Sequence, residues 1–253
     1  MTPAARERAR VRTPVLFISA VAWILLVLQP GGLVISAHHH SLAMPGIKMT
    51  SSAHLLTALN SPASLMTGWA LMLAAMMAPL LTAPVRHLRD RSFTRRRARA
   101  IALFAAGYAT IWMLAGFVLL SVALALQQIA PASSLPLMLA AAIALVWQFS
   151  PFKQRCLNRC HAHPELAAFG LAADLDAFRF GLTHGLWCVG SCWALMLLPP
   201  LAARGHLLVM AAVTLWLFSE RLDQPKPPTW RYRGPNTAAR VVIAQTRLRL
   251  QRS

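Results

Sequence analysis

The sequence predicts an all-α, polytopic membrane protein: a bundle of about six transmembrane helices with both termini in the cytoplasm. Of the 253 residues, 57% are hydrophobic and only 13% are charged, whereas a soluble domain carries about 25% charged residues. The charges are also segregated, because long apolar blocks alternate with clusters of arginine. Such alternation is typical of a chain that crosses the bilayer several times.

Six apolar segments are predicted to span the membrane. They cover residues 14–35, 64–84, 100–126, 132–149, 181–201 and 206–218. Most of them approach the ~20 residues that a helix needs to cross about 30 Å of hydrocarbon. The fourth segment is marginal in length and the last is short, but an odd number of spans would scatter the charges over both sides.

The charges determine the predicted orientation. With both termini inside, the cytoplasmic segments contain 23 of the 25 lysines and arginines, and all seven acidic residues. Only Lys48 and Arg204 fall outside, so the positive-inside rule favours this topology. The predicted organisation is a basic tail over 1–13, a six-span membrane domain over 14–220 with a cysteine-bearing cytoplasmic loop over 150–180, and a Pro/Arg-rich tail over 221–253. We expect this last tail to be disordered or loosely bound to the membrane surface.

The net charge of +18 does not require a nucleic-acid partner. Arginines that flank membrane spans contact anionic headgroups of the lipid bilayer, at about 1 kcal/mol for each residue near the surface. The basic stretches lack interleaved aromatic residues and any nucleic-acid-binding motif. We therefore expect the bilayer, and no nucleic acid, to be the partner of these charges.

Four cysteines form two pairs of identical spacing. Cys156 and Cys160 lie where the fourth span runs out into basic sequence, and Cys188 and Cys192 lie inside the fifth span. A spacing of four places both sulfurs of a pair on one helix face, about 6 Å apart at Cβ. Disulfides are rare on the reducing side of a membrane, and thioredoxin-type pairs are one residue closer. The pattern therefore favours a soft-metal site over a redox centre.

The fifth span carries further candidate ligands. His184, Cys188, Cys192 and Met196 recur every four residues, so the stripe rises about 18 Å and winds by roughly 120°. No single ion could bind all four, but two neighbours could share an ion with ligands from another helix. The other candidate metal ligands are His161 beside the first cysteine pair and Met72 and Met76 on one face of the second span. Buried cysteines and methionines that only pack are the alternative.

Sulfur ligands supplemented by imidazole and thioether select Cu(I), or zinc in a tetrahedral site. The eleven methionines favour copper, because zinc rarely accepts a thioether. The predicted outside loop also contains His38, His39, His40 and His54. This loop either collects metal ions or is a solvated loop that binds none, and the sequence leaves both interpretations open.

Two stretches of the chain resemble a bacterial family of predicted metal-binding integral membrane proteins, a domain of unknown function sometimes labelled copper chaperone. They are residues 148–160, with QFSPFK and the first cysteine pair, and residues 181–196, GLTHGLWCVGSCWALM. The AMMAP motif at 75–79 is similar to a further hallmark. The chain departs from the family at Ser191, where a cysteine is frequent, and at His161, where an arginine is frequent. The resemblance implies metal handling, with copper as the metal, in a bacterial inner membrane.

Three functions remain open on the sequence. The first is a multi-pass, non-enzymatic protein that binds Cu(I) through the cysteine pairs and exchanges it with a metal-delivering or metal-receiving protein. The sequence contains no nucleotide-binding motif, so this chain by itself is not expected to pump ions. The second is a structural membrane subunit whose cysteines only pack. The third is a membrane thiol oxidoreductase, which the cysteine spacing disfavours.

Overall fold

The computed structural model of the protein describes residues 3–28, 62–130, 133–202, 205–230 and 246. Every regular element in these ranges is a helix, which confirms the all-α prediction for them. The elements in chain order are α1 (Pro3–Leu28), α3 (Pro62–Met77), η1 (Ala78–Leu81), α4 (Thr82–Arg91), η2 (Thr94–Arg96), α5 (Arg97–Ile129), α6 (Leu135–Phe149), α7 (Pro151–Arg159), α8 (Gly170–Met196), α9 (Leu198–Leu201) and α10 (His206–Leu222).

Each predicted span coincides with a helix over its described residues. Four helical stretches are long and apolar enough to cross a membrane: Ala9–Leu28, Ala63–Arg91, Thr94–Ile129 and Gly170–Leu201. A fifth is added if α6 and α7, which meet at an angle of 71°, form one broken span. The sixth predicted span corresponds to α10, which has only 17 residues. The described part of the chain thus has four to five helices with the properties of membrane spans.

Prolines explain where two of these helices break. Pro79 lies in the short 3₁₀ turn between α3 and α4, where a residue without a backbone N–H interrupts regular α-helical bonding. At the bend between α6 and α7, the Ser150 side chain accepts a hydrogen bond from the Phe152 backbone N–H, and Pro151 occupies the first helical position. The segment predicted as a loop over 150–180 therefore contains α7 and the first turns of α8.

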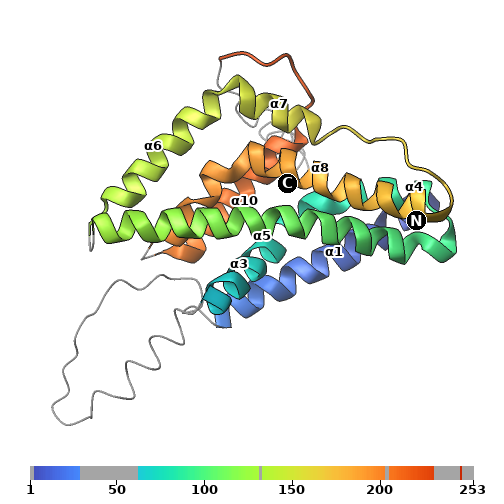
Figure 1. Ribbon diagram of the computed structural model, residues 1–253, viewed down its shortest axis with the longest axis horizontal. Coiled ribbons are helices and arrows are strands. Elements are labelled where there is room, and N and C mark those ends of the chain that lie inside the picture. Colours follow the sequence, from blue (N-terminus) through green and yellow to red (C-terminus); the bar gives the residue numbers. More distant parts are fainter. Residues whose placement is uncertain (1–2, 29–61, 131–132, 203–204, 231–245, 247–253) are drawn as a thin grey trace, which may run out of the picture.

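The long helices α5 and α8 form the centre of the molecule, and they have the most extensive helix–helix contact (Figure 1). Helices α1 and α3 pack together on one side of this pair, while α6 and α7 lie on the other. A Cβ atom at Gly107 of α5 would lie 2.5 Å from the Phe178 carbonyl oxygen of α8, and one at Gly181 of α8 would overlap the Phe104 carbonyl oxygen. These glycines allow the two backbones to touch, as small residues do in membrane helix pairs.

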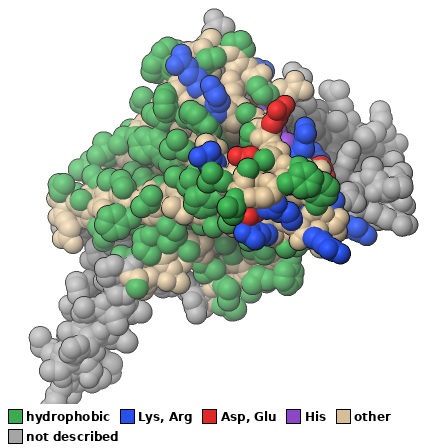
Figure 2. Space-filling view, turned by 45° about the vertical axis from the view of Figure 1, so that its right-hand side comes forward, with side chains coloured by type: hydrophobic (Ala, Val, Ile, Leu, Met, Phe, Trp, Pro, Cys, Tyr) green, Lys and Arg blue, Asp and Glu red, His purple; other side chains and the backbone are tan. Residues whose placement is uncertain are grey.

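The outer surface of the helices is strongly apolar. Phe17 of α1, Phe117 of α5 and Leu215 of α10 are 68%, 64% and 71% exposed. Figure 2 shows hydrophobic side chains over much of one face, with most charged side chains gathered toward one end. A surface of this kind has the distribution that lipid contact requires.

We predict that Gly181→Val destabilises the protein by about 1–3 kcal/mol, because a larger side chain must push α8 away from α5. The midpoint of thermal unfolding of the detergent-purified protein, followed by tryptophan fluorescence, measures this effect. Ala106→Val is the matched control, since Ala106 is an exposed residue of α5. Equal midpoints for the two variants would contradict the close crossing.

Candidate metal centre

The structure brings three of the four cysteines into one buried core. Cys160 at the end of α7 and Cys188 and Cys192 of α8 belong to the same cluster of buried residues, and we call them the thiol cluster. None of the four cysteines is in a disulfide. Met72, Met76 and Met196 lie in the same core, each no more than 1% exposed. These six sulfur-containing residues therefore share one buried core.

Polar hydrogen-bond donors surround the Cys188 sulfur. The Tyr108 hydroxyl of α5 lies 3.3 Å from it, and the Arg221 guanidinium donates to it over 3.2 Å. The Trp112 ring lies 6.4 Å from the Tyr108 ring between centroids, and its indole N–H is buried without a hydrogen-bond partner among the described residues. The Tyr108 hydroxyl and the Arg221 guanidinium thus reach one sulfur atom from two other helices. This arrangement suits a sulfur that carries negative charge, either as a thiolate or as a metal ligand.

Arg221 also links the two cysteine segments. It lies at the last turn of α10 and interacts with Cys160 as well as with Cys188. The Cys192 thiol donates to the Cys188 carbonyl over 3.0 Å, one turn back along α8. Burial raises the pKa of the Cys160 thiol to about 12, with the Arg221 charge opposing this rise. At neutral pH Cys160 is therefore a thiol, and a metal ion bound there must displace its proton.

Cys156 lies apart from the thiol cluster, although it is equally buried. A Cβ atom at Gly190 would lie 2.7 Å from the Cys156 sulfur, so this cysteine packs directly on the glycine. Gly190 is two positions from both Cys188 and Cys192, which places it about 160° away around α8. The Trp147 indole donates to the Gly190 carbonyl over 3.1 Å, so this face of α8 is covered by packing.

The two predicted histidine ligands have different surroundings. His184 is 4% exposed, and its ring packs against Phe104, Tyr108 and Phe180 at centroid distances of 5.9, 6.1 and 5.8 Å. His161 has one ring nitrogen 2.9 Å from the Leu157 carbonyl oxygen and the other 3.2 Å from the Arg221 carbonyl oxygen. Both nitrogens of His161 are thus engaged with the backbone, so the ring fastens the end of α7 to α10.

The structure does not form a site of three or more histidine, cysteine or carboxylate ligands anywhere in the ranges that it describes. Any metal site at the thiol cluster therefore has few thiols and needs methionine sulfur to supplement them. His38, His39, His40 and His54 lie outside the described residues.

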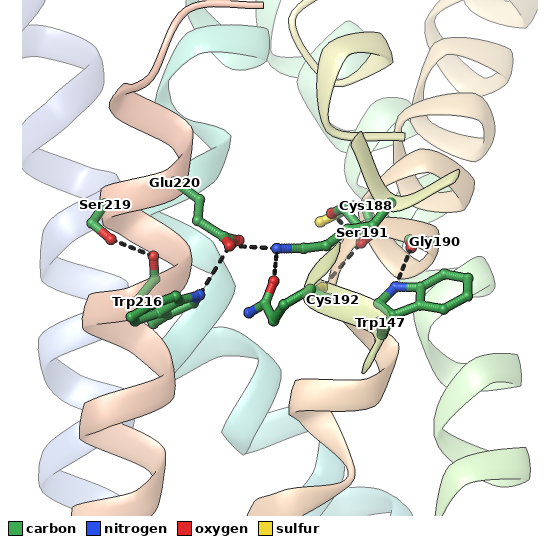
Figure 3. A network of polar contacts seen from close by, with 10 residues as sticks. Trp147, Cys188, Gly190, Ser191, Cys192, Trp216, Ser219 and Glu220 are labelled. Atoms are coloured by element: carbon green, nitrogen blue, oxygen red, sulfur yellow. Dashed lines mark hydrogen bonds and ion pairs between the residues drawn. The ribbon is translucent and has the colours of Figure 1, made fainter. Parts of the chain in front are cut away.

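A buried ion pair fixes α7 to α10 beside the thiol cluster. The Lys153 ammonium donates to the Glu220 carboxylate and to the Gln148 side-chain oxygen, and the Lys153 and Glu220 side chains are only 4% and 6% exposed. The Trp216 indole donates to the same carboxylate over 2.9 Å (Figure 3). Because Glu220 precedes Arg221, this network also positions the guanidinium at the sulfurs.

The chain after α10 packs along α7. The Gln154 side-chain amide forms two hydrogen bonds with the Thr229 backbone, at 2.8 and 3.0 Å. One turn further, the Asn158 amide pairs in the same way with the Lys226 backbone, at 2.7 and 3.3 Å. Residues 223–230 are therefore a defined strap, in contrast to the loose tail expected from their prolines and charges.

The sequence did not single out Arg221, Lys153 or Glu220 as site residues, because terminal charges were interpreted as topology signals. One signal was available: Glu220 and Arg221 lie directly at the end of an apolar segment, where an acidic residue is unusual. Tyr108 and Trp112 gave no signal, since aromatic residues in a span are explained by packing.

The structure thus combines helices that are long and apolar enough to cross a membrane with a buried group of thiols beside an arginine. The family model PpoB2, copper chaperone, matches residues 66–243, which is more than half of the chain. The chain belongs to this family, and the resemblance seen in its motifs is confirmed. The matched range contains all four cysteines and Arg221. Comparisons with curated proteins and with solved structures gave no match.

We predict that Lys153→Met lowers the free energy of unfolding by about 3–5 kcal/mol, because it leaves the Glu220 carboxylate buried without its cation. The double variant Lys153→Met/Glu220→Met should recover most of this loss, since removing both charges of a buried pair is close to neutral. Denaturant unfolding in mixed micelles measures both. Lys226→Met, at an exposed position of the strap, is the control. If Lys153→Met lost no more stability than Lys226→Met, the ion pair would not contribute to the stability of the fold.

Proposed function

We propose that the protein is a six-span inner-membrane copper chaperone that binds Cu(I) at the thiol cluster and passes it to, or accepts it from, a protein partner on the cytoplasmic side. Cys160 and Cys188 are the proposed thiolate ligands, with Met196, Met72 and Met76 as supporting thioethers, while the Cys192 thiol donates to the Cys188 carbonyl beside them. Thiolate and thioether are the ligands that Cu(I) prefers. Copper is the cargo in this proposal, and no catalytic step is required.

The observation that carries the proposal is the Arg221 guanidinium, which donates to the Cys188 sulfur over 3.2 Å and whose positive charge also acts on the Cys160 thiol. Cu(I) bound by two thiolates has a net charge of −1, which is costly inside a low-dielectric core. The guanidinium charge makes the assembly neutral without occupying a ligand position. The Tyr108 hydroxyl can donate to the Cys188 sulfur, as outer-shell groups do in metal sites.

The proposed orientation places this centre near the cytoplasmic surface. The arginine-rich connections define the inner side under the positive-inside rule. Cys160 ends α7, which caps the bundle on the same side as the cysteine-bearing connection to α8. Copper could therefore be exchanged between Cys160 and a cytoplasmic thiol ligand while Cys188 retains it. This order of ligands would make Cys160 the entry residue.

We predict that the purified protein binds about one Cu(I) per chain and that Cys160→Ser/Cys188→Ser abolishes this binding. Competition with a chromogenic Cu(I) chelator under anaerobic conditions, together with metal analysis by mass spectrometry, measures the stoichiometry. Cys156→Ser is the matched control, because Cys156 is buried but faces Gly190. Unchanged stoichiometry in the Cys160→Ser/Cys188→Ser variant would reject the site and leave a scaffold with packed cysteines. Preferential binding of zinc would reject copper as the cargo.

We predict that Arg221→Met lowers Cu(I) affinity by about 10- to 100-fold, the range found for outer-shell partners of metal ligands. Arg221→Lys should retain part of the affinity, because it keeps the charge but loses the planar fork that reaches two sulfurs. The same chelator competition provides the affinities, and thermal unfolding shows whether each variant is folded. An affinity for Arg221→Met equal to that of the unchanged protein would refute the counter-charge function.

A further inference from the structure

A cavity of about 490 Å³ lies between α1, α3, α4 and α5, on the opposite side of Tyr108 and Trp112 from the thiol cluster. Its volume is within the range of about 300–1,000 Å³ that is typical of small-molecule sites. Two of these helices, α1 and α3, lie side by side below α5 in Figure 1. The cavity is open to the surface of the bundle, so a ligand can enter it from there.

The cavity exists because small side chains face one another across it. Ala70, Ala74 and Ala78 recur every four residues from α3 into η1, and Ala105 and Ala109 do the same on α5. All five line the space, and leucines at these positions would have filled it. The helices are held in place independently of the cavity, since the Ser19 hydroxyl of α1 donates to the Ala75 carbonyl of α3 over 2.6 Å.

The lining of the cavity is complementary to an anionic lipid. Its walls are almost entirely apolar, while Arg10 of α1 and Arg89 of α4 lie at the end nearest the arginine-rich connections. The described residues that line it include no acidic side chain. Along α5 the cavity extends from Ile101 to Met113, which is about 18 Å of helix. This length is close to the depth of one hydrocarbon leaflet, about 15 Å.

We propose that this cavity binds one phospholipid with an anionic headgroup, drawn from the leaflet at the arginine-rich end of the bundle. An acyl chain lies along the alanines of α3 and α5, and the phosphate lies between Arg10 and Arg89. Guanidinium groups are well suited to bind phosphate oxygens in pairs. The bound chain also packs against Tyr108 and Trp112, so the lipid supports the wall that these residues form beside Cys188.

Native mass spectrometry of the full-length protein in detergent tests this proposal. Phosphatidylglycerol and phosphatidylcholine with identical acyl chains are titrated separately. The unchanged protein should retain one phosphatidylglycerol about thirtyfold more tightly than phosphatidylcholine, because each arginine contributes about a factor of five near an anionic group. Arg10→Gln/Arg89→Gln should remove this preference. Equal binding of the two lipids by the unchanged protein would overturn the proposal.

The matched control is Arg12→Gln/Arg91→Gln, which removes the same charge from the same two helices at exposed positions that do not line the cavity. This variant should still prefer phosphatidylglycerol to phosphatidylcholine. If it lost this preference, the preference would be due to general surface charge. Ala74→Phe should fill the cavity and so weaken the binding of both lipids. If this variant still retained phosphatidylglycerol, the lipid would bind elsewhere and the proposed site would be refuted. Inorganic phosphate should not displace the lipid, and displacement would show a phosphate site instead.

Discussion

The buried ion pair between Lys153 and Glu220 is the interaction on which the candidate metal centre depends. It joins α7, which carries Cys160, to α10, which carries Arg221, and it does so in a region with little access to water. Charges at such depth are costly unless they are paired and hydrogen-bonded, and here Gln148 and Trp216 complete the network. The pair thereby holds the helix that carries Arg221 against the segment that ends in Cys160.

The central crossing of α5 and α8 supplies the other half of the geometry. Because Gly107 and Gly181 let the backbones touch, Tyr108 of α5 comes within reach of Cys188, which lies about two turns after Gly181 on α8. The result is a sulfur in contact with a hydroxyl and a guanidinium. In a low-dielectric interior these donors act on charge more strongly than they would in water.

The aromatic pair Tyr108 and Trp112 separates two environments of opposite character. On one side lie the thiols with their polar donors, and on the other lies an apolar cavity that ends in two arginines. A change in what fills the cavity would therefore be felt directly at the wall of the metal centre. The proposed lipid site and the proposed metal site therefore both adjoin Tyr108 and Trp112, although the two proposals are tested independently.

The sequence by itself determined the all-α class, the family and the three sulfur-rich segments, because hydrophobic blocks and motif spacing are local properties of a chain. The tertiary structure decided the surroundings of the cysteines: all four are buried, Cys156 packs on Gly190, and Cys160 shares a core with Cys188 and Cys192. It also decided that Arg221, 29 positions after the last cysteine, belongs to the site. Contacts between distant segments depend on helix crossings, and single-helix periodicity carries no information about those.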